Sequence, residues 1–162
     1  MPNYRIAIHG GAGTIRKKDL SREQEMAYRS TLKSDLLAGE KILKSGGTAV
    51  KASIESVKVM EDSPLFNAGK GAVFAHNGGH EMDAAVMDGA TLNIGAVGLI
   101  QGVRNPVLLA EKVMTDSEHV FLCGEGAIEF AKIVDVNMEF PDYFHDEFRY
   151  QQWQNALKQD LS

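Results

Sequence analysis

The segment from residue 60 to residue 71 holds the residues whose types and spacing best suit a binding site. It reads MEDSPLFNAGKG, so two apolar anchors, Leu65 and Phe66, precede an amide, Asn67, and two nearby glycines. Burial of the anchors would fix the loop and leave main-chain carbonyls and the Asn67 amide in need of hydrogen-bond partners. A tightly wound loop of this kind can turn its carbonyls onto a hard cation. From the residues alone, a packed turn without a ligand is the simpler interpretation.

Two glycine-rich loops invite comparison with nucleotide-binding motifs, and both fail it. A dinucleotide fingerprint needs a third glycine in the pattern Gly-x-Gly-x-x-Gly, but the sequence places Arg16 and Glu129 at that position. A phosphate-binding Walker loop needs a glycine well ahead of Gly-Lys and Ser or Thr directly after it. Lys70 instead has Pro64 at the first of these positions and Gly71 at the second. Nucleotide binding is therefore disfavoured.

The other polar residues do not form a recognisable catalytic set. Glu81, Asp83 and Asp88 have the chemistry for acid–base roles, but hydrogen-bonded strand and turn acids are the simpler interpretation. His76 and His80 have a spacing that suits a metal ion on a helix, and here they flank a glycine turn. There is no Gly-x-Ser-x-Gly nucleophile motif.

Composition sets the broad class of protein. The 162 residues are 44% hydrophobic and 24% charged, which is typical of a globular chain with a real core. The net charge of −5 gives no reason to expect a nucleic-acid partner. A single cysteine, Cys123, precludes a disulfide within the chain and favours a reducing compartment. Because neither a membrane-spanning run nor a signal sequence is recognisable, we expect a cytoplasmic protein with no membrane partner.

Hydrophobic periodicity and turn signals predict the elements that must position these residues. Ser21 and Gln24 form a capping box ahead of a helix over 22–45, and Thr48 caps a second helix that ends before Pro64. Asn105 is the expected N-cap of a helix that begins at Pro106. Strands are predicted at 5–9, 71–74, 81–87, 92–103 and 119–123, helices at 49–61, 107–114, 124–132 and 146–158, and irregular structure at 140–143. Hairpin-linked strands with segregated helices predict an α+β fold, with helices packed on an antiparallel sheet.

Four motifs occur in order and at compatible spacing. They are IAIHGGAG at 6–13, PLFNAGKG at 64–71, EMDAAVMDG at 81–89, and GAV at 95–97 followed by VRNPV at 103–107. Together they resemble the plant-type L-asparaginase, or isoaspartyl peptidase, family of N-terminal-nucleophile hydrolases. The resemblance covers roughly residues 4–132, and the ordered set is far more specific than any one motif.

The resemblance implies an αββα sandwich completed by a separate β subunit. The two subunits arise when a precursor cleaves itself, and they commonly assemble as an (αβ)2 heterotetramer. This chain resembles the α subunit, because its length suits that half and its threonines are all internal. In the family, the N-terminal threonine of the β subunit is the nucleophile and its α-amine is the base. The implied reaction is hydrolysis of β-aspartyl dipeptides or of the asparagine side-chain amide, without a catalytic metal or cofactor.

The resemblance assigns supporting roles to this chain. Asn67 matches an asparagine beside the nucleophile, and Gly10 and Gly11 match a glycine loop that lies against the nucleophile's strand. The resemblance also implies a structural alkali cation, most simply Na⁺, ringed by main-chain carbonyls. By matching position, these carbonyls belong to Met60, Glu61, Ser63, Phe66, Ala68 and Lys70.

The resemblance further predicts that residues 1–162 are one segment of a domain shared with the β subunit, with 133–162 as a variable C-terminal linker. An isolated α subunit would expose a large apolar sheet face. A taspase-like or glycosylasparaginase-like relative with a different substrate is one alternative, because these proteins use the same framework. A non-catalytic chain that keeps the framework is another, and it predicts no threonine-initiated partner.

Overall fold

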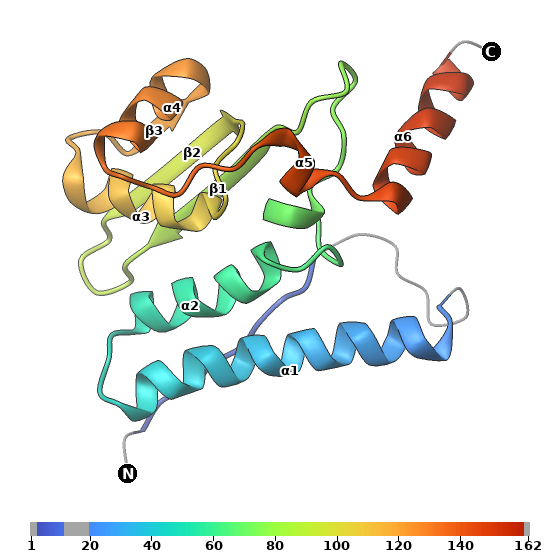
Figure 1. Cartoon of the computed structure of the whole chain (residues 1–162). Coiled ribbons are helices and arrows are strands. Elements are labelled where there is room, and N and C mark those ends of the chain that lie inside the picture. The colour runs from blue at the N-terminus through green and yellow to red at the C-terminus, as the bar shows by residue number, and fades with distance from the viewer. Residues whose placement is uncertain (1–2, 12–19, 161–162) are drawn as a thin grey trace.

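The computed structural model describes residues 3–11 and 20–160. Two long helices form one layer, and a small sheet with its own helices forms another above it (Figure 1). This mixture of helices and a small sheet is compatible with the predicted α+β class. The elements in chain order are α1 (Arg22–Lys44), α2 (Ala49–Glu61), the 3-10 turn η2 (Gly69–Gly71), β1 (Met82–Met87), β2 (Ile94–Ile100), α3 (Pro106–Asp116), β3 (Phe121–Cys123), α4 (Gly124–Ile133), α5 (Pro141–Phe144) and α6 (Glu147–Asp160).

Helices α1 and α2 begin where their caps predict. The Ser21 hydroxyl accepts a hydrogen bond from the Gln24 N–H, and the Gln24 side chain accepts one from the Ser21 N–H, which completes the capping box. The Thr48 hydroxyl caps α2 by accepting a hydrogen bond from the Lys51 N–H at 3.1 Å. The two helices meet at small residues, because a Cβ on Gly39 of α1 would collide with the Ser56 hydroxyl of α2. Close approach at this seam holds the two-helix layer together.

The sheet has the order β1-β2-β3. Strands β1 and β2 are antiparallel, whereas β3 runs parallel to β2, so the expectation of an antiparallel sheet is wrong for β3. The reason is connectivity: α3 crosses back between β2 and β3, and such a crossover returns the chain in the same direction. Gly95 lies directly under α3, where a side chain would strike the Ala110 carbonyl, which explains a glycine inside the strand.

Helices α3 and α4 cover one face of the sheet. The buried cluster there combines strand residues such as Val97 and Ile100 with Leu109 and Val113 of α3 and Ala131 of α4. Residues that alternate with these along β1, β2 and β3 point to the other face, which stays exposed within the described chain. The sheet is therefore closed on one side and open on the other.

Three sequence predictions of local structure are wrong. Residues 5–9 and 71–74 are not strands, because neither segment finds a hydrogen-bonded neighbour within the described residues. Residues 140–143, expected to be irregular, lie largely in the short helix α5. Ile6 of the first segment packs at Gly39 in the α1–α2 seam, so that segment is held by side-chain contact instead. Residues Ala12 and Gly13 of the first glycine loop lie outside the described residues.

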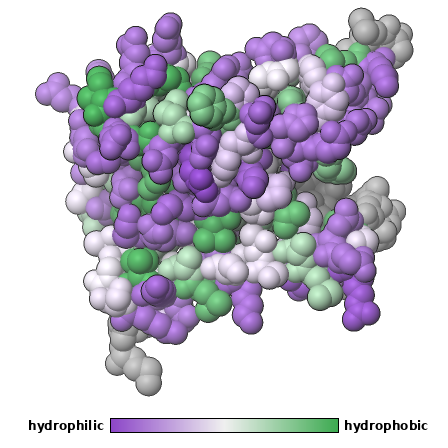
Figure 2. Space-filling view, viewed as in Figure 1, coloured by the Kyte–Doolittle hydropathy of each residue, from purple (hydrophilic) through white to green (hydrophobic). Residues whose placement is uncertain are grey.

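The surface seen in Figure 2 is mainly hydrophilic, with hydrophobic residues in small groups among hydrophilic ones. Among the described residues, no helix is long and apolar enough to span a membrane.

Candidate active site

Residues 60–71, here called the wound segment, are wound as tightly as their glycines predict. Successive turns close through hydrogen bonds from Ser63 N–H to the Met60 carbonyl (3.1 Å), and from Ala68 N–H to the Phe66 carbonyl (2.9 Å). Gly69 has φ of +53° and lies against the Glu61 carbonyl, where a Cβ would collide. Gly71 lies in the same way against the Phe66 carbonyl. The winding therefore draws carbonyls of this segment close to its own backbone.

Two anchors fix this segment to α1 and to the N-terminal residues. The buried Phe66 ring meets the Tyr28 ring edge-on at 5.7 Å, and the Tyr28 hydroxyl donates to the Leu65 carbonyl at 3.2 Å. Gly10 lies against the Phe66 ring, because a Cβ there would stand 3.0 Å from it. The structure thus places Gly10 beside the neighbour of Asn67. The two segments that the resemblance singled out are adjacent in space.

The Asn67 side chain is exposed and oriented. Its Oδ1 accepts a hydrogen bond from the Val73 N–H at 2.9 Å. Because a main-chain N–H can only donate, this bond fixes which end of the carboxamide faces inward. The Nδ2 amide group is left to donate outward. Gly11, with φ of +111°, donates its N–H to Nδ1 of His9 at 3.2 Å.

The carboxyl group of Glu61 has a role that the sequence analysis missed. It is buried, and its Oε1 accepts a hydrogen bond from the Val107 N–H at the start of α3 (3.0 Å). Glu61 thereby performs the capping expected of Asn105, whose side chain makes no cap bond and instead donates to Asp62. Burial raises the pKa of Glu61 to about 7, although the Val107 and Asn105 hydrogen bonds oppose the shift. The residue ties the wound segment to the sheet layer.

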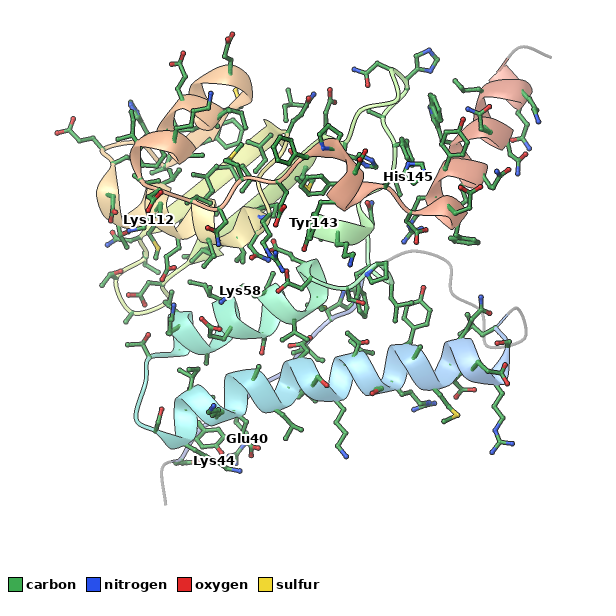
Figure 3. The ribbon with its side chains drawn as sticks, in the orientation of Figure 1. Glu40, Lys44, Lys58, Lys112, Tyr143 and His145 are labelled. Carbon is green, nitrogen blue, oxygen red and sulfur yellow. The ribbon has the colours of Figure 1, made fainter. Side chains whose placement is uncertain are left out.

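Tyr143 of α5 is a second residue whose role the sequence analysis missed. It joins the C-terminal part of the chain to the wound segment. Its hydroxyl donates to Asp62 at 3.2 Å, and the Arg104 guanidinium lies over its ring at 5.0 Å. Arg104 also pairs with Asp62 and with Glu139, at 3.2 and 2.9 Å. Burial and the negative charge of Asp62 raise the pKa of Tyr143 to about 12. Figure 3 shows Tyr143 at the junction of the two layers.

The wound segment offers main-chain carbonyls of the kind that the predicted cation site requires. The carbonyls that Gly69 and Gly71 approach, those of Glu61 and Phe66, belong to the predicted ligand set, and a side chain at either glycine would fill this cradle. Main-chain carbonyl oxygens are the donors that a hard cation prefers. Among the described residues, no group of three or more His, Cys, Asp or Glu side chains is arranged to hold a metal ion.

The remaining candidates have local structural roles. Asp83 accepts a hydrogen bond from the Leu99 N–H (2.9 Å), and Asp88 accepts from Ala90 and Thr91 in a turn, as the simpler interpretation predicted. His80 lies near the Ala72 carbonyl, with Nδ1 at 3.1 Å, and burial lowers its pKa. His80 therefore lies beside the Ala72–Val73 backbone, next to the N–H that orients Asn67. His76 is exposed in the glycine turn.

A family model described as asparaginase matches residues 2–162. The chain belongs to the asparaginase family. This membership implies the N-terminal-nucleophile hydrolase fold, with which the observed helices and small sheet are compatible.

Several relatives of this asparaginase-family chain have names that indicate their activity. It is 45% identical to an isoaspartyl peptidase of Escherichia coli, with 95% of this chain and 48% of the relative covered. It is 48% identical to a plant-type L-asparaginase of Pyrococcus abyssi, over 96% of this chain and 48% of the relative. It is 39% identical to an isoaspartyl peptidase/L-asparaginase of Xenopus laevis, with the same coverage. The chain spans about half the length of these curated relatives.

Proposed function

We propose that this chain is the α subunit of an isoaspartyl peptidase/L-asparaginase that hydrolyses β-aspartyl dipeptides and the side-chain amide of asparagine. The observation that carries the proposal is the match itself. The chain aligns with the family along nearly its whole length, yet covers about half of relatives named for these activities. The other half of the enzyme is a β subunit, produced by self-cleavage of a common precursor.

The open face of the sheet supports a second chain. Met87 of β1, Ile94 of β2 and Phe121 of β3 are exposed on that face, and the strand pairing places them in adjacent rows. An apolar patch of this kind marks an interaction site. A β-subunit sheet stacked on it would complete the αββα sandwich, and two such pairs would form the (αβ)2 heterotetramer.

In the proposed mechanism, the N-terminal threonine of the β subunit attacks the substrate carbonyl while its own amine accepts the hydroxyl proton. The protonated amine then gives that proton to the leaving nitrogen as the C–N bond breaks, which releases ammonia from asparagine or an amino acid from a β-aspartyl dipeptide and leaves a β-aspartyl ester. Water hydrolyses the ester, releases aspartate and regenerates the threonine hydroxyl. Asn67 supports these steps with its outward Nδ2 amine, which can hold the nucleophile or polarise the reacting carbonyl. Gly10 and Gly11 keep the backbone beside the wound segment free of side chains, so the nucleophile's strand can approach.

A structural Na⁺ would be held by the carbonyls of the wound segment and would supply fixed positive charge that stiffens it. The chain's own residues do the positioning: Phe66 anchors the segment, and the Val73 N–H orients Asn67. No proton or electron moves through the cation.

Purified protein, with whatever chain accompanies it, should release aspartate from a β-aspartyl dipeptide and ammonia from asparagine. Asn67→Ala should lower kcat by about a hundredfold, the effect typical of losing one preorganised donor, while the melting curve stays unchanged. Asn155→Ala, which truncates an exposed asparagine on α6, is the matched control and should keep full activity. If wild-type protein hydrolyses neither substrate, the proposed function is wrong.

A further inference from the structure

The orientation of Asn67 depends on the residues that follow it. The Val73 N–H is the donor that fixes the carboxamide, and Phe74 comes directly after it. Val73 lies between η2 and a glycine turn in which Gly78 donates to the Ala75 carbonyl at 2.9 Å. This stretch, residues 72–79, is not part of the sheet. The Ala75 N–H donates to the Gly79 carbonyl (2.7 Å), and Nδ1 of His80 lies 3.1 Å from the Ala72 carbonyl, so these bonds and side-chain packing together fix its position.

An aromatic clamp on α6 supplies that packing. The Phe74 ring stacks on the Trp153 ring, with centroids 5.4 Å apart and planes 19° from parallel, and meets the Tyr150 ring at 5.7 Å. The Trp153 indole N–H donates to the His76 carbonyl at 3.4 Å. Gly78, with φ of +83°, lies under the indole, where a Cβ would stand 3.1 Å from it. Trp153 thus contacts residues 72–79 at Phe74, His76 and Gly78.

Helix α5 contacts the wound segment on both sides of Asn67, at Asp62 before it and at Lys70 after it. The Lys70 ammonium lies 5.6 Å from the centre of the Tyr143 ring, and the Tyr143 hydroxyl bonds Asp62. Figure 3 shows Tyr143 and His145 on one short stretch that leads into α6. The segment 141–153 therefore contacts the chain both before and after Asn67.

We propose that the α5–α6 segment is a strap, and that Trp153 is a positioning residue that holds the Asn67 carboxamide in its working orientation. The inference rests on the proposed function for the use made of Asn67. A carboxamide has two ends of nearly equal shape, and the Val73 N–H distinguishes them. If Trp153 is removed, Phe74 loses its parallel stacking partner and keeps the tilted contact with His80 (4.2 Å) and the edge contacts with His145 and Tyr150, so Val73 is held less firmly. Asn67 then presents oxygen and nitrogen outward in turn.

The decisive experiment is a double-mutant cycle in the assembled enzyme. Trp153→Ala should lower kcat for a β-aspartyl dipeptide by about tenfold with little change in KM, because a misplaced group costs rate more than binding. In an Asn67→Ala background, Trp153→Ala should cost almost nothing further, because Trp153 acts through Asn67. Trp153→Phe, which retains a stacking ring, should restore most of the rate.

A matched control exists on the same helix. Phe148 is an exposed aromatic residue of α6, and its ring lies beside Arg149 of the same helix. Phe148→Ala should leave kcat unchanged. If Trp153→Ala lowers kcat equally with and without Asn67, it acts through general loss of structure and the proposal is wrong.

Hydrogen exchange separates this proposal from the proposed function. In purified protein, Trp153→Ala should speed exchange of the Val73 amide by about tenfold or more, while amides in the middle of α1 keep their protection. An unchanged Val73 amide would overturn the strap. If wild-type protein has no hydrolase activity, the proposed function fails, and the exchange result still decides whether Trp153 holds Val73.

Discussion

The two faces of the sheet are built from alternate residues of the same strands, yet they differ in how fully they are covered. On the closed face, the exposed fractions of Met82, Val97 and Ile100 are 4%, 2% and 0%. On the open face, those of Met87 and Phe121 are 52% and 54%. Leu99, beside a bulge on β2, is also exposed, with φ of +53°. A strand with apolar side chains on both faces is typical of a sheet buried on both sides.

The difference indicates that the described chain covers one face of its sheet and leaves the other face suited to a further contact. Helices α3 and α4 cover the closed face from within the chain, and the open face has the composition of an interior surface. Asp83 is the polar exception there, and its carboxylate is already bonded to the Leu99 N–H. The β subunit of the proposed function would cover this face.

The largest expected effect lies on the closed face. Ile100→Ala should lower the free energy of unfolding by about 4 kcal/mol, because it leaves a cavity beneath α3 that the sheet cannot fill. The measurement is a urea denaturation midpoint at fixed protein concentration. A loss below about 1 kcal/mol would show that the closed face is not a packed core.

Removal of the proposed Na⁺ tests whether the wound segment is stabilised within this chain, as the closed face is. Replacing Na⁺ by a bulky organic cation should lower the unfolding free energy by about 3 kcal/mol if the Na⁺ concentration was about a hundred times its Kd. The melting curve measures this, and returning Na⁺ should restore it. An unchanged curve after full depletion would count against the cation site.

A substitution on the open face should affect association more than folding. Phe121→Asp should weaken binding of the companion chain by about thirtyfold, because it places a charge in an apolar interface. Analytical ultracentrifugation would measure the loss of the complex. Glu125→Gln, a charge change in the first turn of α4, serves as the control. Unaltered association of the Phe121→Asp variant would mean that this face is not the interface.

The smallest effect concerns Asp35, a buried carboxyl group between α1 and α2. Asp35 is fully buried in the α1–α2 seam, and in the described part of the chain neither carboxyl oxygen has a hydrogen-bond partner. Burial raises the pKa of Asp35, and the nearby Ser56 hydroxyl, which donates to the Asp35 main-chain carbonyl at 2.9 Å, partly opposes the shift. Its contribution to stability is therefore greatest below the unfolded pKa of 3.8 and is lost as the pH rises through the folded pKa.

Asp35→Asn should accordingly raise the unfolding free energy at pH 7 by about 1 kcal/mol, since no unpaired charge is buried. The gain should shrink as the pH falls toward 4. Urea midpoints at several pH values measure it, with the exposed Asp142→Asn as control. A gain that does not depend on pH would contradict the stated cause.

Local chemistry accounts for what the sequence predicted well. The caps at Ser21 and Thr48 and the apolar stripes of α1 and α2 act within a few residues, so both helices were placed nearly to the residue. The glycines of the wound segment likewise indicated tight turns. The residues 5–9 and 71–74 were wrongly assigned to strands because a strand needs a neighbour, and composition cannot show whether one is present.

Contacts between distant residues account for most of what was missed. The carboxyl of Glu61 reaches Val107, and Tyr143 reaches Asp62, across stretches that no motif links. One signal was present in the sequence. Tyr143, Phe144, Tyr150 and Trp153 gather in a segment expected to be a variable linker, and such a density of aromatic residues indicates a packed contact. Whether residues 133–162 also act as a linker stays a prediction.

The most direct test is the identity of the companion chain. Intact-mass measurement and N-terminal sequencing of the purified complex should find a second polypeptide whose first residue is threonine, and dipeptide hydrolysis should require both chains. Hydrolysis by the present chain with no companion, or a companion that begins with a residue other than threonine, would contradict the claim that the nucleophile comes from a separate subunit.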